Sequence, residues 1–577
     1  MRTLAALLLA AVPPSAVAQA GDVRVEYELR HEPPAGERDF AQWVVQVDVA
    51  RLPRKGRLDL RLSDWGGWPA ADWPHVELLE SRPALQRGSQ PGHWTAALGG
   101  EREARIRYRV RLTPMGSDAQ RRFGLLPTWS EAYAFGYSWN TLASVEVDGA
   151  RSARAPTLRI EARRGTPIVT GWAGRSEATQ TATLDVALGN APIVFGAPAV
   201  ERVETRAGFP LEVRQFGGGP DITGTLAEVI AACAPAFGRA FGVPARRPYR
   251  AFVTDHQGGG MGSHHGLRIG ATADAPADHA GSPWLRSHVA HELMHDWLGI
   301  GLTEEDPSLV WFKEGFTEYL ALWQATSAGL VSRDWFAGRL LELEGIARER
   351  SSAGQVAFGD PTVTWRDGDG PNEMLAYTGA PLLALRIDAE LRAAGEPGLP
   401  QLVRDLLARE PPRYSLEDLR RWLAEHGQEA RWEASIQGAA LPDVAESLEL
   451  AGYATERVPA DLTYFGLRTD GAEPGCTVLV VDPAGPAGEA GVRAGDVLTG
   501  WFPARGERAH ANDPDPEFPF GLGTFEPGVE GTFLGIRRGG EDLKVPLEPR
   551  VLRGAGHVLR RGSAAKALEA FFRFDPR

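Results

Sequence analysis

The chain has 577 residues, of which 43% are apolar and 24% are charged, and its formal net charge is −13. A chain of this length usually divides into roughly two to four domains, and its apolar content argues against wholesale disorder. The negative charge disfavours nucleic acid as a partner, because phosphate binding requires a basic surface. We therefore expect a soluble, multidomain protein that binds no nucleic acid.

The first residues have the composition of a secretory signal peptide. Arg2 precedes a short apolar run, and small residues then provide two cleavage patterns, Ala16-Val-Ala18 and Ala18-Gln-Ala20. The run is too short to cross a bilayer, and no later stretch of the chain is long and apolar enough to do so. We expect residues 1–20 to be removed and the protein to be periplasmic or extracellular. A buried N-terminal helix is the alternative.

Alternating apolar and polar residues predict a β-rich N-terminal region. Residues 105–112 place apolar side chains on one face and arginines on the other, and residues 43–49 and 58–62 repeat the pattern. Turn signals such as Gly66-Gly67 separate these segments. The period of two favours a solvated sheet face over a basic patch. We predict a β-sandwich over residues 21–205.

The pattern changes after about residue 205. Residues 249–254 are typical of a strand, and they are followed by three glycines at 258–260. Helical periodicity then dominates. We expect helices at 284–299, 311–325, 333–350, 372–395 and 415–426. Residues 206–452 should therefore form an α+β domain with a helical subdomain.

The most informative motif is His291-Glu292-x-x-His295. Residues four apart on a helix lie on one face, roughly 5–6 Å between Cβ atoms, so both imidazoles can bind one ion. Catalytic zinc usually takes a third protein ligand and keeps one position open for water. Glu314, separated from His295 by eighteen residues and in the next expected helix, would complete the set. An ordinary amphipathic helix with two surface histidines would leave Glu292 and Glu314 unexplained.

This spacing, with Glu314 in the sequence Trp-Phe-Lys-Glu-Gly-Phe, resembles the gluzincin metallopeptidases, and within them the glycyl-aminopeptidase family. The resemblance covers residues about 21 to 550. It implies a multidomain α+β protein with a β-rich N-terminal domain, a thermolysin-like catalytic domain and a C-terminal PDZ domain. It also implies one zinc ion per chain and aminopeptidase-like hydrolysis of peptides or proteins.

The resemblance assigns roles to further residues. Glu292 corresponds to the general base. Glu318, four residues after Glu314, corresponds to the acid that orients a ligating histidine, although a plain surface glutamate is the alternative. Tyr377 corresponds to the oxyanion donor. Relatives carry Tyr-x-Lys-Gly-Ala, whereas this chain has Tyr377-Thr-Gly-Ala, which leaves a buried core tyrosine as the alternative.

Relatives also carry a glycine-rich strand, Gly-Gly-x-Glu-His, whose backbone lines the substrate. Gly259, Gly260 and Met261 are its counterparts here. Gly262 stands where relatives have the acid that binds the α-ammonium of the substrate. That anchor is therefore missing or supplied by one of three other acids, Glu304, Glu305 and Glu373.

Residues 453–550 carry segments in PDZ order, with Phe465, Gly466 and Leu467 as the expected peptide-binding loop. Three prolines within residues 512–519 are incompatible with a helix interior where a PDZ helix is expected. A structural or lid-like domain is therefore as well supported as one that binds a peptide ligand. Residues 551–577 are expected to be a C-terminal tail.

Two questions stay open at this stage. Cys233 and Cys476 fall in different expected domains, which favours free thiols over a disulfide. A non-catalytic peptide-binding protein on the same scaffold is the alternative function. Glu292 beside three ligands disfavours it, because a binding module needs no general base.

Overall fold

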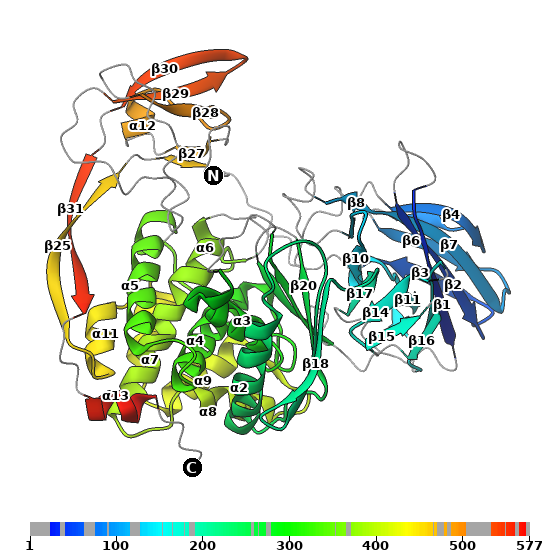
Figure 1. The fold of residues 1–577 in the computed structure, drawn as a ribbon, viewed down its shortest axis with the longest axis horizontal. Helices are drawn as coiled ribbons and strands as arrows, with labels where there is room; N and C mark the ends of the chain where they lie inside the picture. The colour runs from blue at the N-terminus through cyan, green and yellow to red at the C-terminus, as the bar shows by residue number, and fades with distance from the viewer. Residues whose placement is uncertain are drawn as a thin grey trace, which may run out of the picture. The chain divides into compact units, whose positions relative to one another are not determined.

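The computed structural model describes most of the chain, and every structural statement below refers to these residues: 23–34, 41–62, 76–88, 92–115, 127–152, 154–163, 165–172, 174–177, 179–183, 191–255, 259–263, 265–272, 279–351, 353–364, 371–464, 467–469, 478–481, 486–502, 532–547, 550–559 and 565–572. The chain forms two compact units (Figure 1), Met1–Ala451 with Lys566–Arg577, and Gly452–Ala565. The expected signal peptide lies outside the described residues. No helix in the described part is long and apolar enough to span a bilayer.

The N-terminal region is β-rich, as predicted. One sheet has the order β16 (Thr179–Thr183), β13 (Thr157–Glu161), β1 (Arg24–Glu32), β2 (Gln42–Ala50), β7 (Glu103–Arg111) and β4 (Val76–Arg82). A second has the order β12 (Ala150–Arg151), β11 (Ser144–Val147), β3 (Gly56–Arg61), β6 (His93–Leu98) and β5 (Gln86–Arg87). Apolar residues of both sheets, such as Val47, Leu60 and Ile106, form one core. The alternation in β7 thus buries one face of the strand and exposes its arginines.

A third sheet connects this region to the rest of the first unit. Its order is β15 (Gly174–Glu177), β14 (Pro167–Thr170), β17 (Pro192–Phe195), β10 (Ala134–Tyr137), β9 (Thr128–Trp129) and β8 (Thr113–Pro114). Phe135 and Tyr137 of β10, with Trp139 of the short helix η3 (Ser138–Asn140), pack in one cluster with Phe252 and Met261 of the following sheet. The N-terminal region therefore contributes aromatic side chains beside that following sheet.

A fourth sheet has the order β18 (Val200–Arg206), β19 (Phe209–Gln215), β20 (Tyr249–Thr254), β22 (Gly266–Gly270) and β21 (Gly260–Ser263). β19, β20 and β22 are parallel, and β21 is an antiparallel edge strand. Helix α2 (Thr223–Phe241) connects β19 to β20 and was not predicted, although Leu226, Ile230 and Phe237 are buried at helical spacing. Cys233 is a buried free thiol in this helix, whereas Cys476 lies outside the described residues.

Helices make up most of the remaining first unit (Figure 1). In chain order they are η4 (His279–Gly281), α3 (Pro283–Met294), η5 (Pro307–Leu309), η6 (Trp311–Phe316), α4 (Thr317–Ser327), α5 (Arg333–Arg350), α6 (Pro371–Thr378), α7 (Ala380–Ala393), α8 (Leu399–Leu407), α9 (Leu416–Glu425), α10 (Glu429–Arg431), η8 (Trp432–Gln437) and α11 (Val444–Leu450). A short parallel pair, β23 (Thr303–Glu304) and β24 (Arg413–Tyr414), lies among them.

Three of the predicted helices differ in how well their boundaries agree with the structure. The predicted helix at 333–350 is confirmed as α5. The helix expected at 284–299 ends at Met294, because the Asp296 and Trp297 N–H groups that follow bond to carbonyls three residues back, in a tighter turn than an α-helix. The single helix expected at 372–395 is two helices, α6 and α7, divided at Gly379.

The described residues of the second unit form three small sheets. β25 (Thr455–Tyr464) pairs with β31 (Arg550–Leu559), β26 (Leu467–Thr469) with β27 (Val478–Val481), and β28 (Val497–Phe502) with β29 (Thr532–Arg538) and β30 (Glu541–Leu547). Helix α12 (Pro486–Glu489) contributes to its small apolar core. Of the expected peptide-binding loop, Phe465 and Gly466 lie outside the described residues and Leu467 begins β26. The PDZ-like assignment stays a prediction.

The segment expected to be a tail differs from that expectation. It contains nearly all of β31, and helix α13 (Ala565–Phe571), which returns to the first unit. The indole N–H of Trp323 donates to the Phe571 carbonyl at 3.1 Å, and the guanidinium of Arg392 lies 5.6 Å from the Phe571 ring. Leu568 and Phe572 are also buried. Apolar residues at helical spacing thus fasten the chain end to the helical subdomain.

Candidate metal centre and catalytic site

Helix α3 positions both histidines of the motif. Its first turn is capped by Ser282, whose hydroxyl oxygen accepts a hydrogen bond from the Leu285 N–H at 3.1 Å, and Pro283 occupies the first helical position. His291 lies in the last turn and His295 at the C-cap, still with helical backbone angles. The helix therefore presents both imidazoles on one face.

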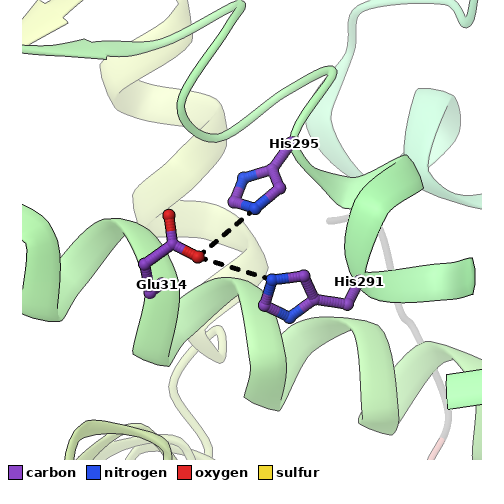
Figure 2. A group of neighbouring side chains, drawn as sticks. All are labelled: His291, His295 and Glu314. Carbon is purple, nitrogen blue, oxygen red and sulfur yellow. Dashed lines mark ion pairs between the residues drawn. The ribbon is translucent and has the colours of Figure 1, made fainter. Parts of the chain in front are cut away.

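His291, His295 and Glu314 converge as predicted. The Glu314 Oε2 atom lies 3.5 Å from His291 Nε2 and 3.4 Å from His295 Nε2, and all three atoms lie within 4.8 Å of one another (Figure 2). Ligands bound to zinc at roughly 2.0–2.1 Å in a tetrahedron are about 3.3–3.4 Å apart. The donor types and the two measured separations therefore fit a zinc ion.

The hydrogen bonds of the two imidazoles favour the tautomers that metal binding requires. His295 Nδ1 lies 2.9 Å from the carbonyl oxygen of Leu298, which can only accept, so this nitrogen carries the proton. His291 Nδ1 lies 2.8 Å from Glu318 Oε2. Burial opposes ionisation of Glu318, but the hydrogen bond to His291 and the positive charges of His291, Arg339 and His288 together hold its pKa below the usual range. With Nδ1 protonated in each ring, both Nε2 atoms would present their lone pairs to a metal ion.

Glu314 lies in η6, a π-helical turn that continues into α4. Such turns often occur at functional sites. The next residue is Gly315, where a Cβ would lie 2.3 Å from the Cβ of Ala380 and 2.9 Å from the Ala376 carbonyl oxygen. Glycine at this position therefore lets α6 and α7 pack directly on the turn that carries Glu314.

This close packing brings Tyr377 of α6 beside the ligand set. Burial raises the pKa of the Tyr377 phenol well above its usual value, and the neighbouring carboxylates of Glu314, Glu373 and Glu292, with a hydrogen bond to Glu314, raise it further. The phenol of Tyr377 is thus close enough to the ligand Glu314 and to Glu292 for their charges to shift its pKa.

Glu292 lies between α3 and the edge strand β21. Its Oε2 accepts a hydrogen bond from the Gly262 N–H at 2.6 Å, and Oε1 lies 4.0 Å from His288 Nε2. A Cβ at Gly260 would lie 2.3 Å from the Glu292 Cγ. The glycines of β21 are therefore needed because this strand packs directly against α3.

Gly262 cannot readily carry the acid that relatives have at this place. A Cβ there would lie 2.7 Å from the His295 Cβ and 2.6 Å from the Glu292 carbonyl oxygen. Among the other acids considered, Glu304 is bound to the buried Lys313 at 3.0 Å, and Glu305 is exposed. Glu373 remains near the site, as its effect on Tyr377 indicates.

Of the three residues expected to line the substrate, Gly260 lies against Glu292 of α3, and Gly259 directly precedes β21. Met261 is buried in the aromatic cluster that the N-terminal region contributes. Arg268 pairs with Met261 across β21 and β22, is 2% exposed, and donates from Nε to Thr254 Oγ1 at 2.9 Å. Sequence patterns gave no signal for Arg268, because only the strand register places it beside Met261.

Lys313 was also missed. Its side chain is 7% exposed and forms its ion pair with Glu304 directly beside the ligand Glu314. Burial alone would raise the pKa of Glu314, but His295, His291 and Lys313 together hold it well below its usual range. In the sequence, the position of this lysine directly before a candidate ligand was the signal that could have identified it.

Comparison with known proteins supports the fold. No family model and no curated protein sequence matches the chain. An aminopeptidase N family protein from Idiomarina loihiensis superposes with a TM-score of 0.73 at 15% identity, over 95% of this chain and 100% of that chain. An M1 zinc metallopeptidase from Deinococcus radiodurans matches with a TM-score of 0.46 at 15% identity, over 73% of this chain and 95% of that chain, which is too weak to carry an argument.

The first match shows a shared fold across nearly the whole chain. It agrees with the multidomain α+β architecture that the resemblance to gluzincins implied. At 15% identity it does not transfer activity, and the closer assignment to the glycyl-aminopeptidase family stays a prediction.

Proposed function

We propose that this chain is a zinc-dependent peptidase that hydrolyses bonds in peptides or proteins. The observation that carries the proposal is the convergence of two imidazole nitrogens and one carboxylate oxygen within 4.8 Å. Glu292, with the chemistry of a general base, follows the first of these ligands. The fold shared with an aminopeptidase N family protein supports the same conclusion.

His291, His295 and Glu314 would hold one zinc ion per chain, with Glu318 orienting His291. A bound zinc ion supplies Lewis-acid activation of a water molecule and of the substrate carbonyl. The protein supplies the charge that balances the ion and the hydrogen bonds that fix both imidazoles.

Glu292 acts as the general base in this proposal. Its carboxylate takes a proton from the attacking water and later delivers it to the leaving amine. The hydrogen bond from Gly262 holds Oε2 against the edge strand, which leaves Oε1 to accept the proton. Tyr377 donates a hydrogen bond to the oxygen on which negative charge develops.

The activity is aminopeptidase-like with relaxed end-specificity. A buried substrate ammonium normally requires a carboxylate partner. Gly262 offers none, and Glu304 is already bound to Lys313. Peptides without a free N-terminal ammonium should therefore also be accepted. Export by a signal peptide and a peptide ligand for the second unit are further proposals from sequence.

The test combines metal analysis with cleavage of a mixed peptide library by the full chain. Glu292→Gln should retain stoichiometric zinc and lose nearly all cleavage, because an amide cannot shuttle the proton. His295→Ala should lose zinc as well, whereas His426→Ala, distant in sequence at the C-cap of α9, should retain both. Full activity in Glu292→Gln, or stoichiometric zinc in His295→Ala, would contradict the proposal. Peptide binding without cleavage by the wild type would favour the non-catalytic alternative.

A further inference from the structure

Trp284 is an unusually exposed side chain in a mechanistically important helix. Among the described residues, only four large apolar side chains are exposed, and Trp284, at 44%, is the one tryptophan among them. It lies in the first turn of α3, the helix that carries His291 and Glu292. A single exposed apolar residue needs no explanation by itself. Its contacts therefore decide whether it matters.

The exposed indole is part of a ladder of rings that leads to the metal ligands. Trp284 stacks on His288 with ring centroids 5.0 Å apart and an interplanar angle of 19°. His288 in turn stacks on His291 at 6.4 Å and 25°. Its Nε2 atom lies 4.0 Å from Glu292 Oε1. One ring therefore separates the exposed indole from the candidate general base.

The edge strand β21 indicates which part of a bound peptide would lie near these stacked rings. β21 is the last strand of its sheet, and no described strand pairs with its other edge. Gly260 contacts Glu292 and Gly262 contacts His295, so β21 and α3 run past the site in the same direction. A peptide that adds antiparallel to β21 would place the residues after the cleaved bond at the Trp284 end.

The described residues next to Trp284 are mainly rings. Arg286, the nearest guanidinium in sequence, is paired with Glu228 at 2.9 Å, and His279 lies 5.8 Å from Trp284 as another ring. In the described part of the chain, His279, Trp284 and His288 thus provide flat aromatic surface at this end of α3. Such a surface suits an aromatic side chain, which stacks in an offset geometry.

We propose that Trp284, stacked on His288, forms a subsite for an aromatic side chain on the substrate residue that follows the cleaved bond. The proposal rests on the peptidase function proposed above. It makes Trp284 a specificity-determining residue that takes no part in the chemical step.

The first experiment compares two peptides that differ only in the residue after the cleaved bond, phenylalanine or alanine. The wild type should cleave the phenylalanine peptide with a higher kcat/KM. Trp284→Ala should lower that value about tenfold and leave the alanine peptide unchanged, since an aromatic contact contributes on this scale. Trp284→Phe should retain most of the preference. Leu450→Ala, which removes another exposed apolar side chain, should change neither peptide.

A binding measurement separates this proposal from the proposed activity. In the Glu292→Gln background, calorimetry should show tighter binding of the phenylalanine peptide, and Trp284→Ala should abolish the difference. Equal binding of the two peptides, or a preference that survives Trp284→Ala with zinc content intact, would overturn the subsite. If the wild type cleaves neither peptide, the peptidase proposal fails, while the calorimetric preference still decides the subsite.

Discussion

Two sets of buried charges in this molecule have opposite organisation. In the second unit, Asp496 is 2% exposed and accepts hydrogen bonds from Arg538 Nε at 2.7 Å, Arg538 Nη2 at 2.6 Å and the Arg493 N–H at 2.8 Å. In the metal centre, the nearest approach of Glu314 to the two imidazole Nε2 atoms is 3.4 Å. The first set is held together by its own hydrogen bonds, whereas the separations in the second match those between ligands of one zinc ion.

This comparison shows which kind of buried charge indicates a functional site. Burial of a carboxylate is unfavourable unless it is paired, so both sets require compensation. Arg538 supplies it within the fold for Asp496. For Glu314 the fold supplies imidazoles whose remaining nitrogens are already fixed by Glu318 and Leu298. A set of ligand atoms that face one another, on side chains held in a fixed orientation by hydrogen bonds, is organised to bind an ion.

The largest expected effect beyond loss of the general base concerns Tyr377. Tyr377→Phe should lower kcat by about 10²–10³, the scale of removing one oxyanion donor. Steady-state kinetics with zinc-loaded protein would measure it. Tyr414→Phe is the matched control, because its hydroxyl is buried without a hydrogen-bond partner. An unaffected Tyr377→Phe would mean that the donor lies elsewhere.

A smaller effect is expected for the residue that orients His291. Glu318→Ala should weaken zinc affinity or activity by roughly 10–100-fold without abolishing the site, because it leaves all three ligands in place. Zinc titration against a competing chelator would measure the change. Glu417→Ala, at an exposed position on α9, serves as the control. Complete loss of zinc in Glu318→Ala would place it among the ligands.

A still smaller effect is expected at the substrate N-terminus. One peptide with and without N-acetylation should differ in kcat/KM by less than about tenfold, or roughly 1.4 kcal/mol, which is too little for a desolvated ion pair. A loss above a thousandfold on acetylation would reveal an acidic anchor in the site. Glu373→Gln would then be the variant to examine, since Glu373 lies near Tyr377.

The self-satisfied pair should affect stability and leave catalysis unchanged. Asp496→Asn should destabilise the second unit by about 1–3 kcal/mol at pH 7, at the lower end because Arg538 is 32% exposed. Hydrogen bonds from Arg538 lower the pKa of Asp496, so its contribution is present above the unfolded pKa of about 3.9 and is lost as pH falls through the folded pKa.

Denaturant unfolding of the full chain at pH 7 and in acid would measure that contribution, alongside zinc content and cleavage. Asp542→Asn, in an exposed pair with Arg537, is the control and should cost about 0–1 kcal/mol. A change in zinc content caused by Asp496→Asn would remove the distinction between the two charge sets.

Local patterns in the sequence determined much of this protein. The strand at 249–254 and the helix at 333–350 are confirmed, and the helix expected at 415–426 is α9, because each depends on side-chain periodicity within a short segment. His291, Glu292 and His295 could be identified because a helix fixes their spacing. Glu314 followed from the presence of a second acidic helix at the usual distance.

Only the tertiary structure decided how distant segments meet at this site. Arg268 and Met261 become neighbours through strand register, and Tyr377 approaches Glu314 because Gly315 lets two helices pack on a π-turn. Only the structure shows that Glu304 neutralises the charge of Lys313, and only the structure shows that the ring of Trp284 is exposed. These relations depend on packing between segments far apart in the chain, and no local periodicity encodes them.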